Sequence, residues 1–200
     1  MMRSRKSQIR ARLVRQRKSL SLYLSLFILS VSCLFLHAGE QRFSQLEYKI
    51  RAAYLYNFLL LTEWPSESDE RTNDRLTLAI LGEPEFDQEL FRPIAGEEID
   101  NTTIVVKHYD EWEEVADLEG CLLLYVGHSQ TKHLSKIVNA LRHSPVLLVS
   151  DIPGFLRQGG MIQFITVHNT VRFIINKKQI DASGIRISVQ LFRVAFHILK

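Results

Sequence analysis

The first residues that could support chemistry are Ser150 and Asp151, which directly follow the apolar run VLLV at 146–149. Such a run predicts a buried β-strand, and α/β proteins bind ligands beyond the carboxyl ends of these strands. Two arginines also interrupt later apolar segments, Arg172 in VRFII and Arg186 in GIRIS. A guanidinium fits a carboxylate or another anion closely, so these four residues form a candidate ligand site.

A purely structural interpretation of the same residues stays open. Asp151 precedes Ile-Pro-Gly, and aspartate is favoured in turns because its side chain bonds to the nearby backbone. A charged side chain in an apolar segment must be paired or must point to solvent. Arg172 on an exposed hairpin face and Arg186 at an element end would both satisfy that condition.

Other catalytic and ligand-binding motifs are missing from the sequence. The glycines at 154, 159 and 160 lack the G-x-G-x-x-G spacing of a phosphate-binding loop. Among the histidines only His128 and His133 are close, and a spacing of five does not align two metal ligands on one helix face. No G-x-S-x-G elbow is present. We therefore predict a non-enzymatic protein with no metal and no cofactor.

The elements that must position these residues alternate between helical and extended patterns. An apolar helix is predicted over 44–61, ending before Trp64-Pro65. Strands are predicted at 76–81, 102–107, 121–126 and 146–149, with helical segments at 85–91, 110–118 and 129–143. The end of the chain predicts a hairpin of 161–167 and 171–175, joined by His168-Asn169-Thr170, and a terminal helix over 188–199. We expect a single α/β domain with a mostly parallel sheet flanked by helices, a C-terminal antiparallel β-hairpin and a terminal helix.

The first 38 residues are typical of an export signal. Eight Lys and Arg and no acidic residue precede Gly39, and the 17-residue apolar run at 20–36 ends shortly before Ala38. We expect cleavage near Ala38, leaving a domain over 44–200 in the periplasm. Two alternatives stay open: the run is an uncleaved membrane anchor, or Cys33 is lipidated.

Charge and cysteine content narrow the function of the exported part. Without the leader, the 200-residue chain keeps 17 basic residues against 22 acidic ones, which argues against nucleic acid as a partner. Cys121 is then the only cysteine, so no internal disulfide can form. It opens the apolar run CLLLYV and is predicted to be buried. A hydrolase that uses Cys121 or Ser150 as its nucleophile has no support, because the sequence shows no catalytic triad around either residue.

Three stretches together resemble the YfiR family. They are YKIRAAYLYNFLLLTEWP at 48–65, LAILGEPEF at 78–86, and the long segment from LLLVSDIPGF to RISVQLFRVA at 147–195. The resemblance covers about 47–198. It implies an exported regulatory protein that binds the sensor region of an inner-membrane diguanylate cyclase or sensor kinase. It also implies repression of cyclic di-GMP synthesis and biofilm formation, possible sequestration by an outer-membrane lipoprotein, and a possible homodimer.

For such a partner we predict a binding surface on the 151–173 turn and hairpin, extended by the terminal helix. The residues chosen combine apolar and basic side chains, as protein interfaces do. They are Phe155, Arg157, Met161, Phe164 and Arg172. The alternative function is a periplasmic sensor of a small ligand, bound by Ser150, Asp151, Arg172 and Arg186.

Overall fold

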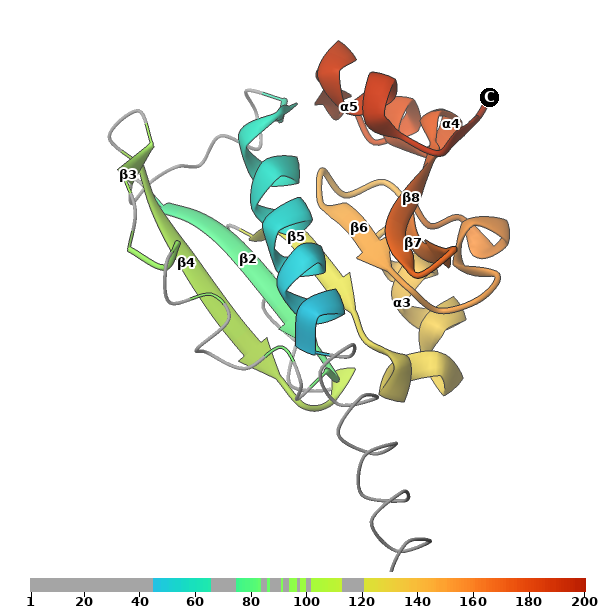
Figure 1. Cartoon of the computed structure of the whole chain (residues 1–200), viewed down its shortest axis with the longest axis horizontal. Coiled ribbons are helices and arrows are strands. Elements are labelled where there is room, and N and C mark those ends of the chain that lie inside the picture. Colours follow the sequence, from blue (N-terminus) through green and yellow to red (C-terminus); the bar gives the residue numbers. More distant parts are fainter. Residues whose placement is uncertain are drawn as a thin grey trace, which may run out of the picture. The chain divides into compact units, whose positions relative to one another are not determined.

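A computed structural model describes residues 45–65, 75–83, 86, 91, 94–96, 98–99, 102–112 and 121–200. Within them, one large sheet has the order β10-β8-β7-β6-β5-β2-β4-β3 (Figure 1). Its strands are β2 Arg75–Leu81, β3 Glu98–Ile99, β4 Thr102–Tyr109, β5 Cys121–Val126, β6 Leu147–Ser150, β7 Ile162–Val167, β8 Thr170–Asn176 and β10 His197–Leu199. Strands β4, β2, β5, β6 and β7 are parallel neighbours, while β8 is antiparallel to β7. The predicted mostly parallel sheet with an antiparallel C-terminal hairpin is confirmed.

The central strands are buried because their sequences are continuously apolar. Every residue of β5 and β6 is buried. Strands covered on both faces lose the alternation of apolar and polar side chains that a half-exposed strand shows. The helix over residues 45–60 crosses one face of the sheet, and the crossover from β5 to β6 contains α3, Leu134–Ala140 (Figure 1).

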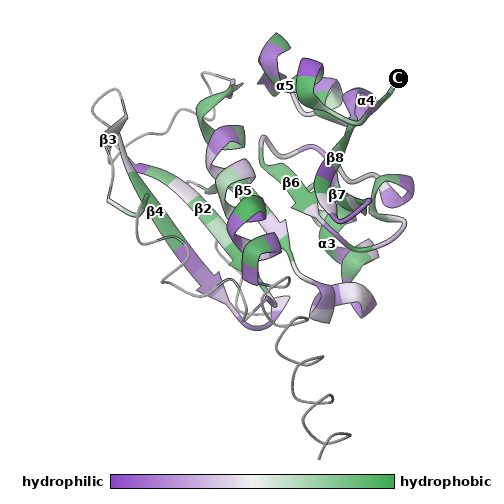
Figure 2. Ribbon diagram, viewed as in Figure 1, coloured by the Kyte–Doolittle hydropathy of each residue, from purple (hydrophilic) through white to green (hydrophobic). Residues whose placement is uncertain are grey.

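Aromatic side chains join helix 45–60 to the sheet. Phe58 is fully buried and its ring centroid lies 5.9 Å from that of Phe164 on β7 and 5.0 Å from that of Phe173 on β8. Tyr54, one turn earlier, lies 5.2 Å from Phe173. Such pairs add to the free energy gained by burying apolar area. The helix is thus part of the same hydrophobic core as the sheet, and Figure 2 shows the apolar residues of both.

The helix predicted over 129–143 is two shorter elements. A 3-10 helix, η3 His128–Lys132, precedes α3. The predicted apolar face is nevertheless correct, because Leu134, Ile137, Val138 and Leu141 are all buried.

The hairpin has a tighter turn than predicted. His168 and Asn169 alone form the loop, with φ of 47° and 57°, and Thr170 already belongs to β8. Two consecutive positive φ values match the twist of an antiparallel hairpin, and asparagine tolerates this region better than most residues.

The prediction of a terminal helix over 188–199 is wrong beyond residue 194, where the helix ends in the structure. Helix α5 is Val189–Val194, and Ala195 has an extended ψ of 140°. The Phe196 amide then donates to the Phe173 carbonyl at 2.8 Å, and β10 pairs in parallel with β8. Backbone groups on the outer side of β8 gain partners in this way, which outweighs the helical pattern of the side chains.

Several small elements were not predicted, among them one helix and a pair of two-residue strands. Helix α4, Lys177–Ala182, begins where the Asn176 side chain accepts a hydrogen bond from the Gln179 amide. Strands β1, Thr62–Glu63, and β9, Arg186–Ile187, form a separate antiparallel pair.

The predicted leader lies outside the described residues, as do most of the segments at 85–91 and 110–118. None of the helices in the described ranges is long and apolar enough to span a membrane.

Candidate functional site

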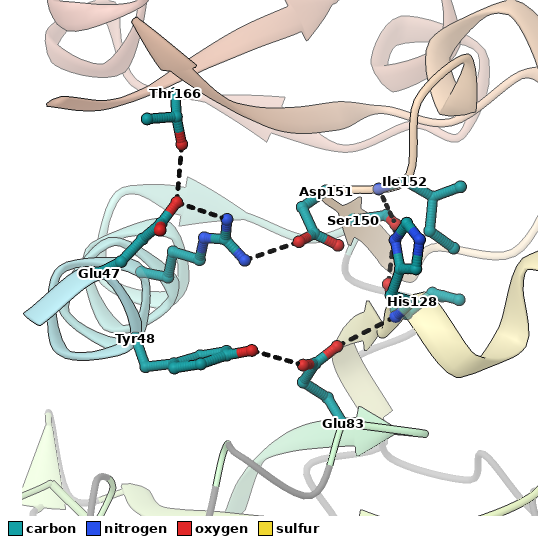
Figure 3. A network of polar contacts seen from close by, with 10 residues as sticks. Glu47, Tyr48, Glu83, His128, Ser150, Asp151, Ile152 and Thr166 are labelled. Atoms are coloured by element: carbon teal, nitrogen blue, oxygen red, sulfur yellow. Dashed lines mark hydrogen bonds and ion pairs between the residues drawn. The ribbon is translucent and has the colours of Figure 1, made fainter. Parts of the chain in front are cut away.

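Polar side chains converge at the carboxyl ends of the parallel strands (Figure 3). Helix 45–60 supplies Glu47, Tyr48 and Arg51, which lie within about one turn of each other. The strand ends supply Glu83 after β2 and Asp151 after β6. This is the edge at which open α/β sheets bind ligands, and the first turns of helix 45–60 lie over it.

Arg51 is the centre of the largest group of contacts. Its Nη1 donates to Asp151 Oδ2 at 2.6 Å and its Nη2 donates to Glu47 Oε1 at 2.7 Å. The Thr166 hydroxyl on β7 donates to the same Glu47 oxygen at 2.6 Å. The side chains of Arg51 and Asp151 are only 11% and 18% exposed, so their attraction is less screened than that of a surface pair. Arg51 thereby joins the helix to the end of β6.

Charge around Arg51 reinforces its ionised form. Burial alone lowers the pKa of a guanidinium. This effect is outweighed by the attraction to nearby negative charges, which come from Tyr125 in its ionised form, from Asp151 and from Glu47. The pKa of Arg51 is therefore raised above its ordinary value, and the group stays positive.

Glu83 forms a second link between the helix and the strand ends. Its carboxylate accepts a hydrogen bond from the Tyr48 hydroxyl at 3.0 Å and another from the His128 backbone amide at 3.0 Å (Figure 3). Gly82 allows the chain to turn just before it, with a φ of 65°. A Cβ on Gly82 would lie 2.3 Å from Ser129 Oγ, so no larger residue fits.

Ser150 has a structural role in this arrangement. It is fully buried, its hydroxyl donates to the Val126 carbonyl at 2.7 Å, and it accepts from the Ile152 amide at 3.0 Å. Both partners are backbone groups, so the hydroxyl joins the ends of β5 and β6. Of the predicted ligand residues, the structure brings only Ser150 and Asp151 together.

The two predicted arginines lie elsewhere. Arg172 is exposed and alternates with buried Val171 and Phe173, so it lies on the face opposite to helix 45–60. Arg186 is exposed on β9, where it is in register with Glu63, beyond the other end of helix 45–60. In place of the two predicted arginines, the network contains Arg51 and Glu47. Their spacing of four places opposite charges on one face of a helix, which is the sequence signal for this part of the network.

Three buried polar atoms of the network have no hydrogen-bond partner. They are Arg51 Nε, Asp151 Oδ1 and the Tyr125 hydroxyl. Burial raises the pKa of Tyr125 well above its ordinary value, and the Asp151 carboxylate raises it further while Arg51 opposes them. The Tyr125 phenol is therefore neutral and interacts with the Asp151 carboxylate, while Arg51 Nε is left as a buried N–H donor without a partner.

The predicted partner surface is mostly core. Phe155, Met161 and Phe164 are each at most 1% exposed, so they do not contact a partner in the folded protein. The Phe155 ring packs against Gly160, where a Cβ would lie 2.3 Å from the ring. Only Arg157 and Arg172 of that set are exposed.

Cys121 is buried, as predicted, and its thiol donates to the Leu123 carbonyl at 3.3 Å. Burial raises its pKa to about 12, so the nucleophilic thiolate is not populated near neutral pH. Within the described part of the chain, no three His, Cys, Asp or Glu side chains lie close enough together to hold a metal ion.

Comparison with known proteins adds a family and two weakly similar structures. A model of the YfiR/HmsC-like family matches residues 48–196. A conserved domain protein from Vibrio cholerae has a TM-score of 0.47 at 11% identity, over 61% of this chain and 54% of that chain. An ABC domain in complex with L-Trp from Streptococcus pneumoniae has a TM-score of 0.46 at 12% identity, over 62% and 55%. The chain thus spans about half the length of these two proteins. A search of the curated proteins finds no significant match.

Proposed function

The chain belongs to the YfiR/HmsC-like family, and from this we propose that it is a periplasmic regulator of a membrane signalling protein. It binds the sensor region of an inner-membrane protein, in our proposal a diguanylate cyclase that it represses. Cyclic di-GMP and biofilm formation fall as a result. The observation that carries the proposal is the family match over 48–196, which includes helix 45–60 from Tyr48 onward and every strand of the large sheet except β10.

The leader and the buried nucleophiles support the same proposal. A basic segment followed by an apolar run at 20–36 is typical of an export signal, with cleavage near Ala38. Ser150 and Cys121, the two candidate nucleophiles, are both buried against backbone groups. A protein of this kind acts by binding rather than by catalysis.

Repression then depends on a difference in affinity. The regulator lowers the activity of its target only if it binds the inactive sensor conformation more tightly than the active one. Moving a two-state target from 1:99 to 99:1 requires a preference of about 10⁴-fold. An interface that holds both conformations equally well would not regulate.

The experiment is an in vivo crosslink and affinity purification from envelope fractions. The tag is inserted directly after the predicted cleavage site, so that β10 at the C-terminus stays native. We expect a membrane protein with an exported sensor region and a cytoplasmic cyclase domain. The matched control lacks residues 2–38 and should not form the complex. Recovery of the exported protein without any membrane signalling protein would contradict the proposal.

A second candidate function rests on the three unpartnered polar atoms at the strand ends. Buried polar groups in proteins are normally hydrogen-bonded, so Arg51 Nε, Asp151 Oδ1 and the Tyr125 hydroxyl could be completed by a small polar ligand. The protein would then be a ligand sensor. A metabolite that raises the melting temperature of the wild type, but not of Tyr125→Phe, would favour this function.

A further inference from the structure

The charge of the exported chain is divided sharply between its two halves. Residues 40–120 contain seven Lys and Arg against twenty Asp and Glu, whereas residues 121–200 contain ten against two. Both acidic residues of the second half are paired, Asp151 with Arg51 and Asp181 with Lys177. The second half forms β5 to β10, so the β10 end of the sheet is basic in a domain that is acidic as a whole.

The same end carries most of the exposed apolar side chains. Six large apolar residues are exposed in the described ranges, and four of them lie within 189–199. They are Val189 (63% exposed), Val194 (53%), Phe196 (55%) and Leu199 (38%). The basic side chains of Arg193, His197 and Lys200 are exposed between and beside them. Exposed aromatic and basic side chains in one short segment are typical of a binding surface.

The sheet is open at this end. Strand β10 pairs with β8 on one side, and no strand of the described chain pairs with its other side. An edge strand presents unpaired N–H and C=O groups, which match an extended polypeptide in spacing and direction. His197 and Leu199 point to one face and Ile198 to the other, so an added strand would meet apolar and basic side chains.

We propose that the outer edge of β10, with the exposed side chains of α5, binds an extended segment of a partner protein by strand addition. This inference rests on the proposed function, because the partner is the regulated membrane protein. The segment combines acidic with apolar side chains. Acidic groups complement Arg193 and Lys200, and apolar groups cover Val194 and Phe196.

Two other occupants fit these observations less well. A second copy paired through the same edge would bring Arg193 and Lys200 of both copies together, and like charges across an interface are costly. An anionic lipid surface would satisfy the basic and apolar side chains, but lipid does not supply the alternating backbone donors and acceptors that an open strand edge matches.

The test is site-specific photo-crosslinking in the envelope of living cells. A benzophenone amino acid replaces Phe196 in one strain and Arg157, on the surface first predicted, in another. We expect adducts from position 196 that map to an extended acidic and apolar segment of the co-purified membrane protein. The charge reversal Arg193→Glu with Lys200→Glu should reduce that adduct by about tenfold or more, as the loss of two ion pairs would.

A matched control changes the charge by the same amount elsewhere. Lys132→Glu with Arg142→Glu alters two exposed basic residues near α3 and should leave the adduct unchanged. Adducts from position 196 to residues 1–44, to a second copy or to lipid overturn the inference. So do adducts only from position 157. In each of these cases recovery of the membrane protein leaves the proposed function standing, whereas its absence from the purification overturns the function itself.

Discussion

Arg51 connects helix 45–60 to the end of β6 through one well-shielded ion pair. Replacement by Met removes the charge and leaves the Asp151 carboxylate 18% exposed without its cation. We expect the free energy of unfolding of the leaderless protein to fall by about 2–4 kcal/mol. Urea denaturation followed by circular dichroism measures it. Lys177→Met, in an exposed i,i+4 pair with Asp181, is the control and should cost less than about 1 kcal/mol. Equal losses of unfolding free energy in the two variants would contradict the idea that burial makes the Arg51–Asp151 pair stronger than an exposed pair.

Cys121 should make the protein less stable in alkali. Its pKa is about 12 in the folded state, against an ordinary value near 9, so the folded protein holds the thiol proton more tightly than the unfolded chain. The stabilisation is complete below about pH 9 and is lost as the pH rises toward 12. We expect the difference in free energy of unfolding between wild type and Cys121→Ala to shrink over this interval. A constant difference from pH 8 to 11 would show that the thiol ionises equally in both states.

At the scale of elements, the sequence predicted those parts of the fold that depend on local pattern. Four strands followed from continuous apolar runs, although β4 is only partly buried, and the hairpin followed from two β-rich segments around His168-Asn169. The end of the chain was mispredicted because Leu191, Phe192 and Phe196 have helical spacing. Only the folded sheet reveals that β8 has a free side for Phe196 and β10 to pair with.

The candidate site was predicted only in part, because some of its residues are indicated by local pattern and others meet only in the folded protein. Ser150 and Asp151 follow a strand, so their place at the sheet edge could be inferred from sequence. Arg51 lies 100 residues from Asp151, and its contact exists only because helix 45–60 docks on the sheet. The surface residues Phe155, Met161 and Phe164 were misassigned because local sequence does not distinguish a core aromatic from an exposed one.

At the scale of the whole molecule, helix 45–60 and the sheet share one core. Residues 47–200 form one compact unit, and Phe58 contacts both β7 and β8 through Phe164 and Phe173. Trp64, just beyond the helix, donates its indole N–H to the Leu122 carbonyl on β5 at 3.1 Å. A helix bound in this way should not unfold before the sheet, because separating them exposes the same aromatic cluster on both sides.

Phe58→Ala tests this cooperativity. Truncation of a fully buried phenylalanine should lower the free energy of unfolding by about 3–5 kcal/mol, since it removes apolar contacts and leaves a cavity. The variant should still unfold in one transition, with far-UV circular dichroism and tryptophan fluorescence giving the same urea midpoint. Leu60→Ala, on an exposed position of the same helix, is the control and should change stability by less than about 1 kcal/mol. Separate midpoints for the two signals would mean that the helix is an independent element, and that a partner could displace it without unfolding the sheet.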